Sequence, residues 1–217
     1  MPALTRLVEP ASFCVTLAQA KAHIRVDHSD DDSLIQNLIE AASDYVERAT
    51  NVTMTWTRYR WTLETFPAGA IELPRRPLVL GSTGAWPTTV GGSPSTTEDR
   101  TSPVVKFIQG YDTEVTNTWL PADEEFRARD GNPPLLSLWG AVQWPLLGTW
   151  NPFPVTIDFT AGFSQDGTSV PKQLKQAVLL LVGHWYIHRE AASPDGAVPV
   201  PYAVEAILSL YESGEYV

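Results

Sequence analysis

The sequence predicts an α+β fold in which helices from both ends of the chain form one bundle and a β-rich insert lies between them. Both flanks show apolar residues at helical spacing. The middle is different: it holds seven of the eight tryptophans, from Trp56 to Trp150, and twelve of the eighteen prolines, from Pro67 to Pro154. We therefore expect N-terminal helices in 1–51, the insert with long loops in 52–165, and C-terminal helices with a tail in 166–217.

The N-terminal flank contains two predicted helices. Thr16 to Gln19 form a capping box, which starts a short helix that ends near Ile24. Ser29 to Asp32 offer a cap and place negative charge at a helix start, where the helix dipole favours it. The apolar face of the second helix, which runs to about Thr50, consists of Leu34, Ile35, Leu38, Ile39, Ala42, Tyr45, Val46 and Ala49.

The insert is expected to contain strands and two irregular regions. From Trp56 to Leu63 the Thr-, Tyr- and Trp-rich sequence favours a long strand. The irregular regions are Gly81 to Pro103 and Pro121 to Pro134, which are rich in turn residues. Shorter strands are predicted at Ala70–Leu73, Leu78–Leu80, Val104–Ile108 and Val155–Thr160.

The C-terminal flank predicts a central helix and a last, shorter one. Pro171 suits the first helical position, and the helix that follows to about Glu190 is apolar nearly all round, so it should be buried. After a Pro-containing linker, the last helix runs from Tyr202 to about Glu212. Its apolar stripe, Val204, Ile207, Leu208 and Tyr211, either folds back on the bundle or faces a partner.

Composition excludes several classes of protein. With 217 residues, 43% of them apolar and 18% charged, the chain is neither disordered nor fibrous. A net charge of −10 argues against nucleic-acid binding, since the nearest basic pairs, Arg58 with Arg60 and Arg75 with Arg76, are too small. The single cysteine, Cys14, indicates a reducing cytosol, and the sequence predicts neither a secretory signal nor a membrane span.

No motif in the sequence carries recognisable catalytic chemistry. His184 and His188 have metal-ligand spacing, but Trp185 stands where a zinc protease needs Glu, so we expect no metal. Nucleophile-elbow and phosphate-loop motifs are missing, and we expect no cofactor and no enzymatic activity. Two alternatives remain open: a carbohydrate-binding module that uses the tryptophans of the insert, and a metal-dependent hydrolase.

The order of several segments resembles the head–tail connector (adaptor) proteins of tailed bacteriophages, which also occur in gene transfer agents. The N-terminal signature spans Val15 to Asp27 and continues from Asp32 to Glu47. The later segments are Phe66-Pro67, Ile71 to Leu78, Ala161-Gly162-Phe163, Val170-Pro171, His184-Trp185-Tyr186 and Arg189-Glu190.

The resemblance implies a structural protein of the virion neck that assembles in the host cytoplasm. Its copies would form a ring, of twelve subunits, beneath the portal protein, let double-stranded DNA pass, and support a neck stopper or tail-terminator protein. In line with this, we expect Tyr211, Tyr216 and Val217 to contact the portal. The loop that holds Trp86, Thr96 and Asp99 is expected to meet a neck partner.

Overall fold

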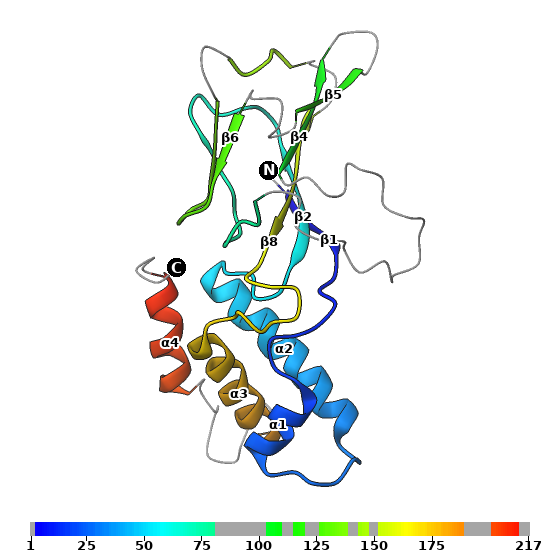
Figure 1. Cartoon of the computed structure of the whole chain (residues 1–217), viewed down its shortest axis with the longest axis vertical. Coiled ribbons are helices and arrows are strands. Elements are labelled where there is room, and N and C mark those ends of the chain that lie inside the picture. Colours follow the sequence, from blue (N-terminus) through cyan, green and yellow to red (C-terminus); the bar gives the residue numbers. More distant parts are fainter. Residues whose placement is uncertain are drawn as a thin grey trace. The chain divides into compact units, whose positions relative to one another are not determined.

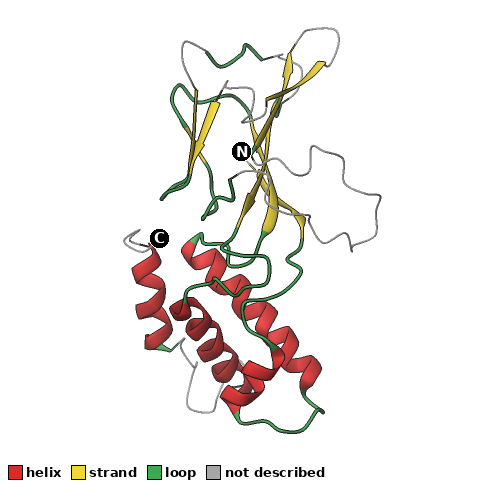
Figure 2. Cartoon of the chain, viewed as in Figure 1, coloured by secondary structure: helices red, strands yellow, loops and turns green. Residues whose placement is uncertain are grey.

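The computed structural model describes residues 3–80, 103–109, 115–119, 126–138, 143–147, 152–188 and 201–212. Helices and β-sheets are both present, which confirms the mixed α+β class (Figures 1 and 2). The chain divides into two compact units. The β unit consists of Met1–Glu9 and Trp56–Gly162, and the helical unit consists of Pro10–Thr55 and Phe163–Val217.

The helical unit brings both ends of the chain around one apolar core. Its helices are α1 (Leu17–Ile24), α2 (Asp32–Thr50), α3 (Lys172–Ile187) and α4 (Tyr202–Glu212). Helix α3 contacts each of the other three, because apolar residues point from it in several directions. The buried side chains of this core include Ile35, Ile39 and Val46 from α2, Leu174, Val178 and Leu181 from α3, and Val204 and Leu208 from α4.

Local sequence signals set some of the helix ends but not all, since Asp31, the N-cap of α2, makes no side-chain cap hydrogen bond. The Thr16 hydroxyl accepts a hydrogen bond from the Gln19 N–H at 3.2 Å, and the Gln19 side chain accepts one from the Thr16 N–H at 3.0 Å, as the capping box predicts. Helix α2 ends at Asn51, which adopts the left-handed conformation with φ 55°. Helix α3 is shorter than predicted: Pro171 is its N-cap and His188 its C-cap.

The β unit contains two antiparallel sheets. The larger sheet has the strand order β1 (Ala3–Val8), β2 (Thr57–Leu63), β8 (Val155–Ala161), β4 (Val104–Gln109) and β5 (Val115–Trp119). The smaller sheet has the order β3 (Ile71–Glu72), β7 (Leu135–Leu138) and β6 (Phe126–Arg129).

The larger sheet has one apolar and one polar face, because successive side chains of a strand point to opposite faces. On the apolar face, Tyr59 and Phe159 stack at 5.7 Å between ring centroids. The same core takes in Ile71, Phe126 and Leu136 from the smaller sheet. The polar face begins with Arg58, Arg60 and Thr62 of β2, whose strand partners are Thr160, Asp158 and Thr156 of β8.

Several predictions for the β region were wrong. Ala3–Val8, placed with the N-terminal helices, forms β1 and pairs with β2 nearly sixty residues further on, which local sequence does not reveal. Phe126–Arg129 forms β6 within a region expected to be irregular, because its hydrogen-bonding partner is β7. Strands β5 and β7 were not predicted. Conversely, the strand expected at Leu78–Leu80 is a single bridge from Leu78 to Ala161.

Candidate interaction surfaces

The turn between α1 and α2 is held by two side chains from neighbouring elements. The Lys21 ammonium lies 2.6 Å from the Asp32 carboxylate and donates at 2.6 Å to the His28 carbonyl. The Tyr186 hydroxyl of α3 donates to the Asp31 carboxylate at 2.5 Å. These bonds fix the backbone of the turn, and Asp27 and Asp30 lie exposed on it. The turn therefore presents negative charge from a rigid support.

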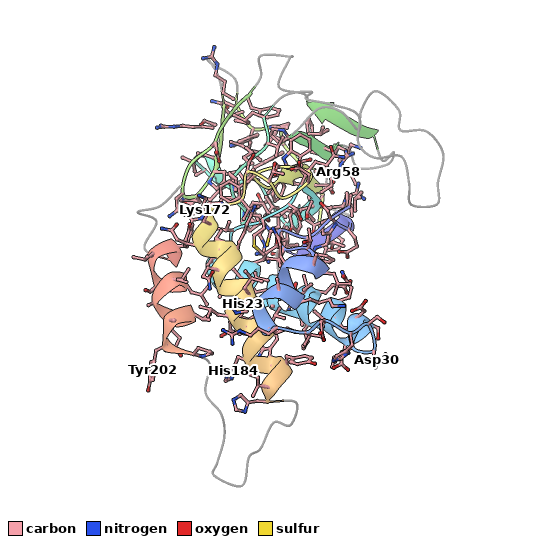
Figure 3. The ribbon with its side chains drawn as sticks, turned by 60° about the horizontal axis from the view of Figure 1, so that its bottom comes forward. His23, Asp30, Arg58, Lys172, His184 and Tyr202 are labelled. Atoms are coloured by element: carbon pink, nitrogen blue, oxygen red, sulfur yellow. The ribbon has the colours of Figure 1, made fainter. Side chains whose placement is uncertain are left out.

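The paired histidines of α3 lie at the end of that helix. Their ring centroids are 4.9 Å apart, and Figure 3 shows His184 on α3. Burial, and then the charge of His188, lower the pKa of His184, which favours its neutral form. Among the described residues, no group of three or more His, Cys, Asp or Glu side chains is arranged to hold a metal ion.

Tyr211 was predicted to contact the portal, but the structure places it inside the helical unit. It is 3% exposed, and its hydroxyl donates to the Gln173 side chain of α3 at 3.0 Å. The apolar stripe of α4 thus folds back on its own bundle, the first of the two alternatives considered for it. A buried side chain leaves no surface for a partner in this conformation. Tyr216 and Val217 lie outside the described residues.

Apolar side chains are nevertheless exposed near the end of α3 and the start of α4. Ile187 is 75% exposed and Tyr202 is 84% exposed. Figure 3 labels Tyr202 on the first turn of α4. Neither exposure was predicted from the sequence, because helical periodicity places a side chain on a face but does not say whether a neighbour covers it.

The polar face of the larger sheet carries an ion pair. The Arg60 guanidinium holds the Asp158 carboxylate through two bonds, Nε to Oδ1 at 2.7 Å and Nη2 to Oδ2 at 2.8 Å. The Lys106 ammonium lies 3.9 Å from the same carboxylate. The hydrogen bonds to Asp158 raise the pKa of Arg60, so this cation persists at any physiological pH. From the sequence, Arg60 was considered only as part of a nucleic-acid patch, and its partner was not predicted.

Two of the tryptophans, Trp144 and Trp185, pack against other aromatic side chains. Trp144 stacks on Phe66 at 4.6 Å between ring centroids, and its indole N–H donates to the Gly69 carbonyl at 3.2 Å. Trp185 packs edge-to-face with Tyr45. These two rings serve as packing units and not as open stacking platforms. The predicted neck-partner residues Trp86, Thr96 and Asp99 lie outside the described residues.

Cys14 is buried in the helical unit and carries no reactive thiolate. Burial first, and then the negative charge of Glu47, raise its pKa to about 12. Glu47 is itself buried and accepts a hydrogen bond from the Met54 N–H at 2.7 Å. The thiol is therefore a packing group.

Of the helices in the described part of the chain, none is both long and apolar enough to cross a membrane.

Comparison with known proteins finds a family model that matches part of the chain and solved structures with the same fold. Residues 14–102 match the family model of the phage gp6-like head–tail connector protein. No curated protein matches the chain in sequence.

Solved structures of gene transfer agent particles contain chains with the same fold. A chain from the neck of the empty particle, computed with C6 symmetry, is 19% identical, with a TM-score of 0.70. A chain from the native virion is 20% identical, also with a TM-score of 0.70. A third, from the neck of the native particle computed with C12 symmetry, is 20% identical with a TM-score of 0.67. Each match covers 96% of this chain and 94% of the other.

The family match spans α1, α2, β2 and β3, and it includes the N-terminal signature on which the sequence resemblance depends. The likeness in fold extends over nearly the whole chain. Residues 14–102 are therefore similar to the phage gp6-like head–tail connector family, and the rest of the chain shares the fold of the gene transfer agent chains.

Proposed function

We propose that this protein forms a ring in the neck of a tailed bacteriophage or phage-like particle, where it joins the portal protein to the next neck component. The observation that carries the proposal is the family match over residues 14–102. The fold supports it, because chains of the same fold occur in gene transfer agent necks solved with C6 and C12 symmetry. A structural role of this kind involves no enzymatic activity.

In this role the protein has four kinds of partner. Copies of itself close the ring, in our proposal as a dodecamer, and the portal protein lies above it. A neck stopper or tail-terminator protein docks below, and double-stranded DNA passes through the channel without sequence-specific binding. The protein assembles in the host cytoplasm and stays in the virion neck.

The charge of the chain suits a DNA channel. At pH 7 the net charge is −10, which repels phosphate and keeps DNA from adhering as it slides. Neither the carbohydrate-binding module nor the metal-dependent hydrolase finds support in the family or in the fold.

The test is electron microscopy of the purified protein with and without its portal protein. We expect rings on portal particles, coaxial with the portal channel. Failure to bind the portal under any condition in which both proteins are folded would contradict the proposal.

The portal contact is proposed to involve the chain terminus. Because Tyr211 is buried in the bundle, the remaining anchors are Tyr216 and Val217. Replacing both by Ala should abolish co-purification with portal rings and leave the fold intact, as judged by circular dichroism. The matched control replaces Ser213 and Glu215 by Ala and should bind as wild type. Equal portal binding by the two variants would exclude the terminus as the contact.

A further inference from the structure

The polar face of the five-stranded sheet is a basic surface in an acidic protein. Three cations lie on it, Arg58 and Arg60 from β2 and Lys106 from β4. Among the described strands its only carboxylate is Asp158, whose side chain is 2% exposed and bound by Arg60. The Arg60 side chain is 42% exposed and that of Lys106 is 28% exposed. The positive charges thus reach solvent, while the one negative charge does not.

Threonines fill the space between these cations. Thr5, Thr62, Thr156 and Thr160 belong to the same face, as their register with Arg58, Arg60 and Lys106 shows. A hydroxyl group both donates and accepts hydrogen bonds. Together with Arg and Lys, which only donate, this makes a face suited to carboxylates.

The helical unit carries the complementary charge. It contains thirteen Asp and Glu against six Lys and Arg, a balance of −7 out of the total of −10. Two of its carboxylates, Asp27 and Asp30, are exposed on the turn that Lys21 and Tyr186 hold in place. Figure 3 shows Asp30 at the N-terminal end of α2.

We propose that the polar face of the sheet docks on the acidic α1–α2 turn of a second copy of this chain. The inference rests on the proposed ring, because a ring closed by rotation joins two different patches of the same subunit. This chain offers two such patches of opposite charge, one in each unit.

DNA fits the face less well than a second copy does. Three cations and one carboxylate leave a balance of +2, whereas stable phosphate binding takes about 6–10 contacts. Each copy also carries ten net negative charges that would repel the duplex. A carboxylate surface on another copy needs only a few complementary charges, since the rest of the interface supplies the affinity.

Charge pairs at the rim of an interface act mainly on association and on its salt dependence. We therefore expect the wild-type ring to assemble at lower protein concentration in low salt than in high salt. Rings are counted by mass photometry, alone or on portal particles, and the midpoint concentration of assembly is the measured quantity.

The first test reverses charge on one patch at a time. R58E/T62E makes the sheet face acidic, and D27K/D30K makes the turn basic. Each should raise the midpoint about tenfold or more. The matched control is R129E/S137E, which changes the net charge as R58E/T62E does but lies on the exposed side chains of the smaller sheet. This control should assemble as wild type. If R58E/T62E misfolds, R58A/T62A takes its place in the test, and its assembly midpoint should still be higher than that of the wild type.

The second test combines the reversals. When R58E/T62E protein is mixed with D27K/D30K protein, each acidic patch faces a basic one, so rings should form from alternating subunits. The chain with all four substitutions should also recover rings by itself. Recovery in either case identifies the two patches as partners, because general damage to the fold is not repaired by a second reversal.

The outcomes separate this proposal from the proposed function. If wild-type protein forms rings but the four-residue chain and the mixture do not recover them, the patches are not partners. The patches are likewise not partners if the control loses rings as readily as R58E/T62E. If R58E/T62E rings form normally but lose retention of DNA in a gel-shift assay, the face contacts DNA and the proposal is wrong. If wild-type protein never forms rings, alone or on portal particles, the result contradicts the proposed function.

Discussion

At the scale of single residues, two glycines are present for different physical reasons. Gly167 has φ +74°, and a Cβ there would lie 2.8 Å from the Cys14 Cα, closer than real Cβ atoms come to backbone. Gly183 lies inside α3, where a Cβ would meet the His23 ring at an ordinary 3.5 Å. Of these two, only Gly167 is required by the fold.

Alanine substitution should separate the two positions. Gly183→Ala removes the entropic cost of glycine in a helix and should raise the free energy of unfolding by up to about 1 kcal/mol. Gly167→Ala places a Cβ against backbone atoms and forces alanine into a left-handed conformation. It should therefore lower that free energy by more than about 1 kcal/mol. Urea denaturation of the two variants measures both changes. The opposite order of stabilities would mean that Gly183 makes room for a closer contact of α1.

Residue-scale predictions from sequence were accurate where the chemistry is local. The capping box of Thr16 and Gln19 needs only a few consecutive residues, so the sequence predicted it in full. Tyr211 is the opposite case, because its burial depends on Gln173, which lies 38 residues earlier in the chain.

At the scale of elements, α3 is the centre of the helical unit. Leu174, Val178 and Leu181 are fully buried on it, and Leu179 and Leu180 are partly buried on its other sides. The near-continuous apolar sequence of α3 predicted this, because a helix that is apolar all round must be covered from several directions.

Leu181→Asp should disrupt this element. The substitution places a carboxylate where the side chain is 0% exposed, which costs several kcal/mol, so the protein should unfold or become insoluble. Soluble yield and the circular dichroism melting curve measure the effect. Gln176→Asp on the exposed side of the same helix is the control and should leave both unchanged. A soluble Leu181→Asp variant with a native melting curve would mean that α3 is not central to the core.

Strands were harder to predict than helices. Strand β3 has two residues, and β6 and β7 have four each. Strands of that length show too little alternation to be distinguished from loops, and their hydrogen bonds come from partners elsewhere in the chain. Strand β2 was found because its seven residues carry strong β-formers.

At the scale of the whole molecule, the buried residues form two separate apolar cores. One core contains residues of the helical unit, the other residues of the β unit, and the described residues of the two cores do not overlap. A domain with its own core can unfold independently of its neighbour.

Weakening one core should therefore increase hydrogen exchange mainly in its own unit. Phe159→Ala removes a fully buried ring from the β unit and should cost about 3–5 kcal/mol. Exchange measured by mass spectrometry should rise in β2, β4 and β8 and change little in α2 and α3. Leu174→Ala in the helical unit is the reciprocal control and should show the reverse pattern. Equal increases in both units would show that the chain unfolds as one cooperative body.

The sequence by itself determined the helices, the capping box of α1 and the apolar faces that build the helical unit, because these depend on periodicity and on contacts within a few residues. It also determined the acidic balance and, through the order of its segments, the resemblance to head–tail connectors, which the family model matches over residues 14–102. Only the tertiary structure decided that the first strand joins the larger sheet, that Tyr211 is buried, and that Arg60 neutralises Asp158. These features depend on residues far apart in the chain, and no local pattern encodes which of them meet.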